Sequence, residues 1–172
     1  KQNVDLLYIA NLIPSTTGWS EFIDHCDYTV KHPEVTLPSP VKVIGALQIW
    51  DDLFMAGYNV SSGNCFSQLE EVFAKTTELF GRRPNNGCTL INFVGQQKTI
   101  PVHTDIRDSF LWQAIGSVEW RICETQSEDS VYQILTVNPG DVLFVPSGLI
   151  HTVFCKDPRA GISIFYDKET HQ

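Results

Sequence analysis

Residues 101–105 read Pro101-Val102-His103-Thr104-Asp105, and the remainder of the chain to residue 166 consists of short apolar runs separated by turns. Side chains two residues apart on an extended strand point to the same face, so the imidazole of His103 and the carboxylate of Asp105 can converge on one cation. His151 is the third candidate ligand, because it follows a turn, an apolar strand and a second turn at 138–150. Two histidines and one carboxylate leave half of an octahedral coordination sphere open, which suits non-haem Fe(II) oxygen chemistry.

The segment around these residues predicts an antiparallel β structure. We expect strands at 88–95, 100–105, 109–115, 118–124, 131–137, 141–145, 150–155 and 160–166. Turn residues such as Asn138-Pro139-Gly140 separate them. Eight short strands that follow two helices indicate an all-β core, a double-stranded β-helix or jelly-roll barrel with the helices packed on its outside.

The N-terminal half supplies the helices. Apolar residues at helical spacing predict one helix near 18–28 and another at about 66–80, with Gly81 just past its end. We expect a strand at 41–50 and a loop at 57–64. We therefore expect residues 1–172 to form a single domain, in which 1–86 contribute strands and supporting helices and 87–166 form the metal-binding barrel core.

Composition restricts the class of protein. The net charge is −8 and the basic residues form no long run, so no duplex nucleic acid footprint is visible. There is no run of about 18 apolar residues and no signal-peptide pattern, so we expect neither a membrane span nor secretion. The sequence starts at Lys1, which leaves open whether a leader was removed. Five widely spaced cysteines indicate reduced thiols and a cytoplasmic location.

Three ordered motifs carry a family resemblance. They are His103-x-Asp105, the hairpin Phe110-Leu111-Trp112-Gln113-x-x-Gly116-x-x-x-Trp120-Arg121, and Pro139-Gly140-Asp141 leading to Pro146-x-Gly148-x-x-His151. Together they resemble the cupin-fold, JmjC-like Fe(II)/2-oxoglutarate-dependent oxygenases, in particular the branch of protein hydroxylases. The resemblance covers about residues 87–166, half of the chain.

The resemblance implies a cofactor set and a reaction. His103, Asp105 and His151 would hold Fe(II), and 2-oxoglutarate would be the cosubstrate. The reaction implied is oxidation of a substrate C–H bond, of hydroxylase type, with release of succinate and carbon dioxide. The substrate is not identified, and a small molecule is as compatible with the sequence as a peptide or protein side chain. The sequence also leaves the oligomeric state open.

The cosubstrate anchor departs from the family pattern. The family commonly places a lysine at the position of Val118, and many other 2-oxoglutarate oxygenases place an arginine at the position of Gly161, followed by x-Ser. Arg159 shares strand parity with Ser163, so we expect both on one face of the strand that contains them. Burying a carboxylate without a partner is costly, and the planar guanidinium of Arg159 is the first candidate to pair with it.

Further candidates complete the predicted cosubstrate site. Arg121 and Lys98 are alternative bases. Asn92 lies in Leu90-Ile91-Asn92, which resembles the strand that carries a 2-oxoglutarate-binding asparagine in the AlkB-like nucleic acid dealkylases. A buried asparagine needs hydrogen-bond partners, and a carboxylate or an oxo group would supply one.

The substrate pocket is predicted from strand alternation. Ser109 and Gln113 share a face of the 109–115 strand, and Trp112 is a candidate wall of the pocket.

Two other functions stay open at this point. One is a cupin metalloenzyme that does not use 2-oxoglutarate, such as a lyase, an isomerase or another oxygenase. The other is a non-catalytic barrel that binds metal or ligand. Val118 and Gly161, which replace the usual bases, favour the first of these alternatives.

Overall fold

The computed structural model describes residues 6–24, 58–61, 68–81, 83, 86–92 and 97–166. The predicted strand at 41–50 lies outside the described residues, as does the part of the first predicted helix beyond residue 24. Residues 19–24 are helical, in agreement with the start of that helix.

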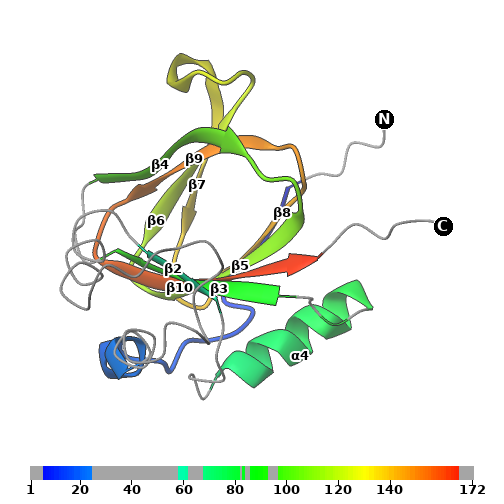
Figure 1. Ribbon diagram of the computed structural model, residues 1–172, viewed down its shortest axis with the longest axis vertical. Helices are drawn as coiled ribbons and strands as arrows, with labels where there is room; N and C mark the ends of the chain where they lie inside the picture. The colour runs from blue at the N-terminus through cyan, green and yellow to red at the C-terminus, as the bar shows by residue number, and fades with distance from the viewer. Residues whose placement is uncertain are drawn as a thin grey trace.

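Two antiparallel sheets form the body of the molecule. The strands are β1 (Leu7–Ile9), β2 (Tyr58–Ser61), β3 (Asn86–Asn92), β4 (Gln97–Thr104), β5 (Asp108–Ile115), β6 (Val118–Cys123), β7 (Val131–Val137), β8 (Val142–Val145), β9 (Ile150–Cys155) and β10 (Arg159–Tyr166). Among the described residues the order of the larger sheet is β1-β8-β5-β10-β3-β2, and that of the smaller sheet is β4-β9-β6-β7. The two sheets face each other, and from β3 to β10 the chain crosses between them at each connection except the one from β6 to β7 (Figure 1). The all-β class predicted from the sequence is confirmed.

The predicted strands match the observed ones closely in the second half of the chain. β7 and β9 have the predicted bounds, and β5, β6, β8 and β10 differ by one residue at an end. The loop expected at 57–64 is a correction, because 58–61 form β2 and pair with β3 at the edge of the larger sheet. Four residues pairing at a sheet edge leave too short a hydrophobic pattern to be recognised in the sequence.

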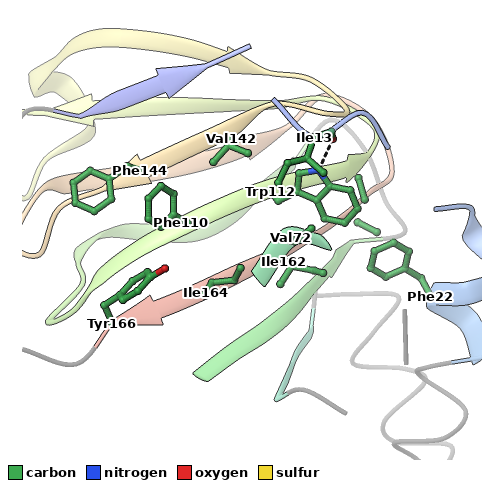
Figure 2. Close-up of a cluster of buried hydrophobic side chains, with 12 residues drawn as sticks. Ile13, Phe22, Val72, Phe110, Trp112, Val142, Phe144, Ile162, Ile164 and Tyr166 are labelled. Carbon is green, nitrogen blue, oxygen red and sulfur yellow. Dashed lines mark hydrogen bonds between the residues drawn. The ribbon is translucent and has the colours of Figure 1, made fainter. Parts of the chain in front are cut away.

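One hydrophobic core lies between the larger sheet and α4 (Leu69–Phe80), which runs across the outer face of that sheet (Figure 1). The helix ends at Gly81, whose φ of 70° is the left-handed conformation that glycine adopts readily, as predicted. Figure 2 shows the side chains of β5, β8 and β10 that point into this core. The predicted role of Trp112 in a substrate pocket is therefore corrected. Trp112 is fully buried in this core and its indole donates to the carbonyl of Ile13 at 2.8 Å (Figure 2).

A second core lies between the two sheets, in the space that we call the lumen. On β5 and β8 it contains residues of alternate parity from those in the first core, and β6, β7 and β9 of the smaller sheet supply the rest: Leu111, Val118, Trp120, Ile122, Val137, Leu143, Val145, Val153 and Cys155. Because side chains alternate along each strand, the neighbours of Leu111 at positions 109 and 113 share the lumen face of β5. The same alternation assigns positions 159, 161 and 163 of β10 to that face, because Ala160, Ile162 and Ile164 belong to the first core.

The Asp141 carboxylate joins β1 to the turn before β8. It accepts hydrogen bonds from the Tyr8 hydroxyl at 2.7 Å and from the backbone N–H groups of Asn11 at 2.8 Å and Asn138 at 2.7 Å. This side chain is 4% exposed, so its charge is compensated by these donors. The Pro139-Gly140-Asp141 motif thus holds the N-terminal strand against the barrel.

Candidate metal centre

Sheet register brings the two candidate histidine ligands together. His103 lies near the end of β4 and His151 near the start of β9, and the two residues are directly paired across the smaller sheet. Their ring centroids are 4.4 Å apart. Directly opposed residues on antiparallel strands point to the same face, so both imidazoles project from one side of the sheet.

Asp105 completes a group of three, one residue beyond the end of β4. One carboxylate oxygen lies 3.8 Å from His103 Nε2 and the other lies 3.8 Å from His151 Nε2. One ligand atom from each of the three residues lies within 4.8 Å of the other two. Among the described residues this is the group of histidine, cysteine and acidic side chains that could hold a metal ion. The donor set fits Fe(II) with open coordination positions.

The Nδ1 atoms of both histidines are held by backbone carbonyls. His103 Nδ1 is 2.9 Å from the carbonyl of Pro101, and His151 Nδ1 is 2.9 Å from the carbonyl of Leu149. A carbonyl only accepts, so each Nδ1 carries the proton and each Nε2 has a free lone pair. Histidines that bind metals usually donate their second ring N–H in this way, which fixes the tautomer and the orientation of the ring.

The environment of His151 also favours its neutral form. The side chain is almost fully buried, and burial lowers its pKa, with the nearby His103 acting in the same direction. The hydrogen bond to Leu149 and the charge of Asp105 oppose this effect without reversing it. A neutral imidazole is the form that binds a metal ion.

Backbone hydrogen bonds hold the loop that carries Asp105 against the turn before β9. The N–H of Gly148 donates to the carbonyl of Asp105 at 2.8 Å, and the N–H of Ser147 donates to the Asp108 carboxylate at 2.8 Å. Gly148 has a φ of 85°, a left-handed conformation that glycine adopts at no steric cost. The Pro146-x-Gly148-x-x-His151 motif therefore fixes the carboxylate and the second histidine relative to each other.

A second polar cluster lies at the opposite end of the lumen. Arg159 and Asn92 are directly paired on β10 and β3, and Arg159 Nε donates to Asn92 Oδ1 at 2.7 Å. Arg159 is 4% exposed and Asn92 1% exposed. Arg159 also hydrogen-bonds to the thiol of Cys155, and burial raises the pKa of that thiol although Arg159 acts against the rise. The Asn92 side-chain nitrogen has no hydrogen-bond partner within the described part of the chain.

Cys155 lies between this cluster and Val118, the position where the family commonly has a lysine. Val118 on β6 is directly opposite Cys155 on β9, and both side chains belong to the lumen core. The guanidinium of Arg159 contacts Cys155, so it comes close to the position where the family commonly has a lysine. A guanidinium from β10 therefore lies near the position at which β6 lacks the expected lysine.

Of the remaining cosubstrate candidates, Ser163 faces the lumen and Arg121 faces the outside of the barrel. Ser163, 9% exposed, is on the lumen face of β10. Arg121 is on the outer face of β6, where it contacts Glu119 at 2.6 Å and lies over the ring of Phe154. The structure therefore does not bring Arg121 to the site, since Trp120 and Ile122 occupy the lumen parity of that strand. Of Lys98 only the backbone is described, in β4 opposite Phe154.

The substrate candidates Ser109 and Gln113 are both buried and on the lumen face, but they lie at opposite ends of β5. Ser109 lies near the start of β5, next to Asp108, whose carboxylate accepts a hydrogen bond from Ser147 in the turn before β9. Gln113 lies in the hairpin at the other end, and its amide nitrogen donates to the carbonyls of Ile115 at 2.7 Å and Gly116 at 3.1 Å. Gln113 thus belongs with the cluster around Arg159.

The sequence patterns missed a tryptophan beside the metal centre. Trp120 stacks on His151 with ring centroids 4.6 Å apart and an angle of 25° between the planes. The presence of Trp120 in the hairpin motif, directly before Arg121, could have indicated a role at the site. Its contact with His151, however, depends on the register between β6 and β9.

A pocket lies beside Asp105. A cavity of about 200 Å³ is lined by Asp105, Ile106, Arg107 and Phe165. Phe165 is paired with Ser109, which places this cavity at the same end of the barrel as the histidines.

With this geometry established, a model of the JmjC domain matches residues 86–172, half of the chain. The chain belongs to the JmjC domain family. The family resemblance inferred from the motifs, to cupin-fold JmjC-like 2-oxoglutarate oxygenases, is thereby confirmed.

Solved structures with similar folds include Escherichia coli ycfD, with 21% identity, 65% of this chain and 34% of that chain covered, and a TM-score of 0.48. The ribosomal oxygenase YcfD from the same organism, in complex with cobalt and 2-oxoglutarate, has 17% identity over 91% of this chain and 54% of that chain, with a TM-score of 0.48. An oxalate decarboxylase from Bacillus subtilis has 17% identity over 67% of this chain and 26% of that chain, with a TM-score of 0.45.

This JmjC domain chain thus spans between about a quarter and about half of the length of these three proteins. At such identities the likeness concerns the fold alone. No curated protein matches the sequence. In the described residues we find no helix with the length and apolar character needed to cross a membrane.

Proposed function

We propose that the chain is an Fe(II)/2-oxoglutarate-dependent oxygenase of hydroxylase type, which oxidises a C–H bond of its substrate and releases succinate and carbon dioxide. The observation that carries the proposal is the convergence of His103, Asp105 and His151 within 4.8 Å in a chain of the JmjC domain family. Two imidazole Nε2 atoms and one carboxylate are the donor set of non-haem Fe(II) oxygenases.

In this proposal the three side chains hold Fe(II). The Nδ1 hydrogen bonds to Pro101 and Leu149 orient the two rings before metal arrives, so little ordering is required on binding. The iron and 2-oxoglutarate, when bound, supply the activation of dioxygen and the oxidation of the C–H bond. The protein binds and orients the reactants and keeps water out of the apolar lumen.

The far end of the lumen would bind the distal carboxylate of 2-oxoglutarate. Arg159 offers a planar guanidinium, and Asn92 offers an amide nitrogen that lacks a partner among the described side chains. A carboxylate bound there would accept charge-assisted hydrogen bonds, which are stronger than those between neutral groups. Ser163, on the same face of β10, is a further candidate donor.

Substrate would enter on the other side of the metal centre. The cavity beside Asp105 contains an apolar wall from Phe165 and Ile106 and a cation, Arg107, and Ser109 lies in the lumen wall near it. A small molecule or a peptide side chain could reach this cavity. The buried free thiols of Cys123 and Cys155 agree with work in a reducing, cytoplasmic compartment.

A spectroscopic experiment tests the proposal. Fe(II) is added to the protein without oxygen, with and without 2-oxoglutarate, and the visible absorption is recorded before air is admitted. A weak charge-transfer band that requires both components, followed by succinate formation in air, is the expected result. The absence of both the band and succinate would reject the proposal.

A second candidate is a cupin metalloenzyme that binds its substrate directly to the metal and does not use 2-oxoglutarate. The observation in its favour is Val118, which is fully buried and apolar where the family commonly has a lysine. The same experiment separates the alternatives. Tight metal binding that 2-oxoglutarate leaves unchanged would favour the second candidate, and binding of metal or ligand without any turnover would favour a non-catalytic barrel.

A further inference from the structure

Trp120 lies between the two polar clusters of the lumen. Along β6 the lumen residues are Val118, Trp120 and Ile122, and they lie opposite Cys155, Val153 and His151 on β9. Cys155 contacts Arg159, and His151 is a candidate metal ligand. Trp120 is therefore halfway along the path that a ligand must take if it reaches from Arg159 to the metal centre.

The indole N–H of Trp120 has no acceptor in the described part of the protein. The side chain is 6% exposed, and its Nε1 is buried without a hydrogen-bond partner there. Buried polar groups nearly always have a partner, because an unsatisfied donor loses its hydrogen bond to water and gains nothing in return. The stack on His151 fixes the plane of the ring, so the indole cannot turn away without losing this contact.

Trp112 shows the usual arrangement in the same molecule. It is fully buried on the outer face of the larger sheet, and its indole donates to the carbonyl of Ile13 at 2.8 Å. The described lumen thus contains a tryptophan donor, the amide nitrogen of Asn92 and the amide oxygen of Gln113 without partners, whereas the tryptophan of the helix-side core is satisfied.

We propose that the Trp120 indole N–H donates a hydrogen bond to a carboxylate oxygen of 2-oxoglutarate bound between Arg159 and the metal centre, an inference that rests on the proposed function. A carboxylate oxygen is a strong acceptor in an apolar lumen. Trp120 then has two contacts, one with the ligand through its N–H and one with His151 through its ring face. It is a residue that positions the cosubstrate relative to the metal ligand.

Nuclear magnetic resonance of the indole N–H groups tests this inference without any turnover. The chain contains four tryptophans, so a sample with ¹⁵N-labelled indoles gives four signals. Zn(II), which is diamagnetic and does not support oxygenation, is added first and 2-oxoglutarate second. We expect the second addition to move the Trp120 indole proton downfield and to slow its exchange with water, and to leave the Trp112 signal in place.

Assignment does not depend on one variant. The signal lost in Trp120→Phe is that of Trp120, and Trp19→Phe, Trp50→Phe and Trp112→Phe identify it by elimination if Trp120→Phe does not fold. An unmoved Trp120 signal in a wild-type sample that calorimetry shows to be saturated with 2-oxoglutarate would overturn the inference. A wild-type protein that binds Zn(II) but not 2-oxoglutarate would instead overturn the proposed function, and the inference with it.

Affinity measurements give a second readout. Trp120→Phe keeps a ring against His151 and removes the N–H, so calorimetric titration should give unchanged Zn(II) affinity and about tenfold weaker 2-oxoglutarate binding, the loss expected for one hydrogen bond to a charged group. Trp112→Phe, which removes an N–H from the other core, should bind 2-oxoglutarate like the wild type. Equal 2-oxoglutarate affinity in Trp120→Phe and wild type would contradict the inference.

Discussion

The spacing of two residues between His103 and Asp105 was enough to predict that they share a face, because strand alternation is a local property. Their juxtaposition with His151 depends on the register between β4 and β9, which includes two irregularities before the histidine pair. No local pattern encodes such a register. The same limit applies to Trp120, whose contact with His151 runs diagonally between β6 and β9.

Parity also separates the candidate bases by the face of the strand on which they lie. Arg159 was predicted to share a face with Ser163, and both lie on the lumen face of β10. Arg121 was noted as a candidate although its parity is opposite to that of Val118, and the structure has it on the outer face with Glu119. A prediction from alternation holds when the strand is regular, and β6 is regular from Val118 to Ile122.

Replacing Asp105 with alanine should abolish metal retention and leave the fold intact. The carboxylate of Asp105 is a third exposed and makes its contacts through the two candidate histidine ligands, so its removal costs little packing. Metal content after dialysis, measured by atomic emission, and the far-ultraviolet circular dichroism spectrum check both parts. Asp157→Ala, an exposed aspartate in the turn before β10, is the matched control. Equal metal content in Asp105→Ala and the control would remove Asp105 from the site.

Replacing Arg159 with leucine should weaken 2-oxoglutarate binding by at least about tenfold, since a charge-assisted pair with a carboxylate is lost. The metal affinity should not change, because Arg159 lies at the other end of the lumen. Two calorimetric titrations without oxygen measure these affinities: Mn(II) into the metal-free protein, and then 2-oxoglutarate into the Mn(II)-loaded protein. Arg121→Leu removes the same charge from the outer face and should bind 2-oxoglutarate normally. An unaltered titration of Arg159→Leu would exclude Arg159 as the anchor.

At the scale of elements, the second half of the chain could be predicted well because its turns contain residues with specific backbone requirements. Gly116 and Gly140 have φ values of 67° and 92°, which glycine adopts readily. Gly116 follows the end of β5 and Gly140 precedes β8, so both lie in turns, as the sequence predicted. In the first half, β2 was predicted as a loop because a short edge strand has little hydrophobic pattern. The role of Asp141 in holding β1 was also not predictable, since its partners Tyr8 and Asn11 are more than 100 residues away in sequence.

The attachment of β1 should depend on pH through Tyr8. Its hydrogen bond to the Asp141 carboxylate raises the pKa of Tyr8 from 10.0 to about 12, because ionised Tyr8 would lose the bond and be repelled by Asp141. The folded state thus binds the phenolic proton more tightly than the unfolded state. The stabilisation is complete below pH 10 and is lost as the pH rises from 10 to about 12.

The variant Tyr8→Phe isolates this contribution. It should be less stable than the wild type by about 1 kcal/mol at pH 8, a modest value for a bond to a charged group because Tyr8 is 36% exposed. The difference between the two proteins in the free energy of unfolding, obtained from urea titrations, should shrink as the pH increases from 9 toward 12. A difference that stays constant over this range would show that the hydrogen bond does not stabilise the fold.

At the scale of the whole molecule, the residues proposed to bind the metal and those proposed to bind 2-oxoglutarate lie on different sheets. His103 and His151 belong to the smaller sheet, and Arg159 and Asn92 belong to the larger one. The sequence located the metal end of this arrangement between residues 101 and 151. For the other end it named Arg159 as the first candidate from its parity with Ser163, but the proximity of Arg159 to the Val118 position exists only after the sheets face each other.

A ligand that bridges the two sheets should stabilise the whole barrel against unfolding. Only the folded state brings the metal centre and Arg159 into one lumen, so binding shifts the equilibrium by mass action, by about 2.7 kcal/mol at a ligand concentration of 100 times Kd. For a chain of 172 residues this corresponds to an increase in Tm of about 5–10 °C. Calorimetric scans with Mn(II) alone, 2-oxoglutarate alone and both together measure it. For the wild type we expect the full increase in Tm only when both ligands are present. Mn(II) alone should give a smaller increase in Tm, equal in Arg159→Leu and the wild type. The Tm of Asp105→Ala should not increase. A wild-type Tm that 2-oxoglutarate does not raise beyond the effect of Mn(II) would contradict the bridge between the sheets.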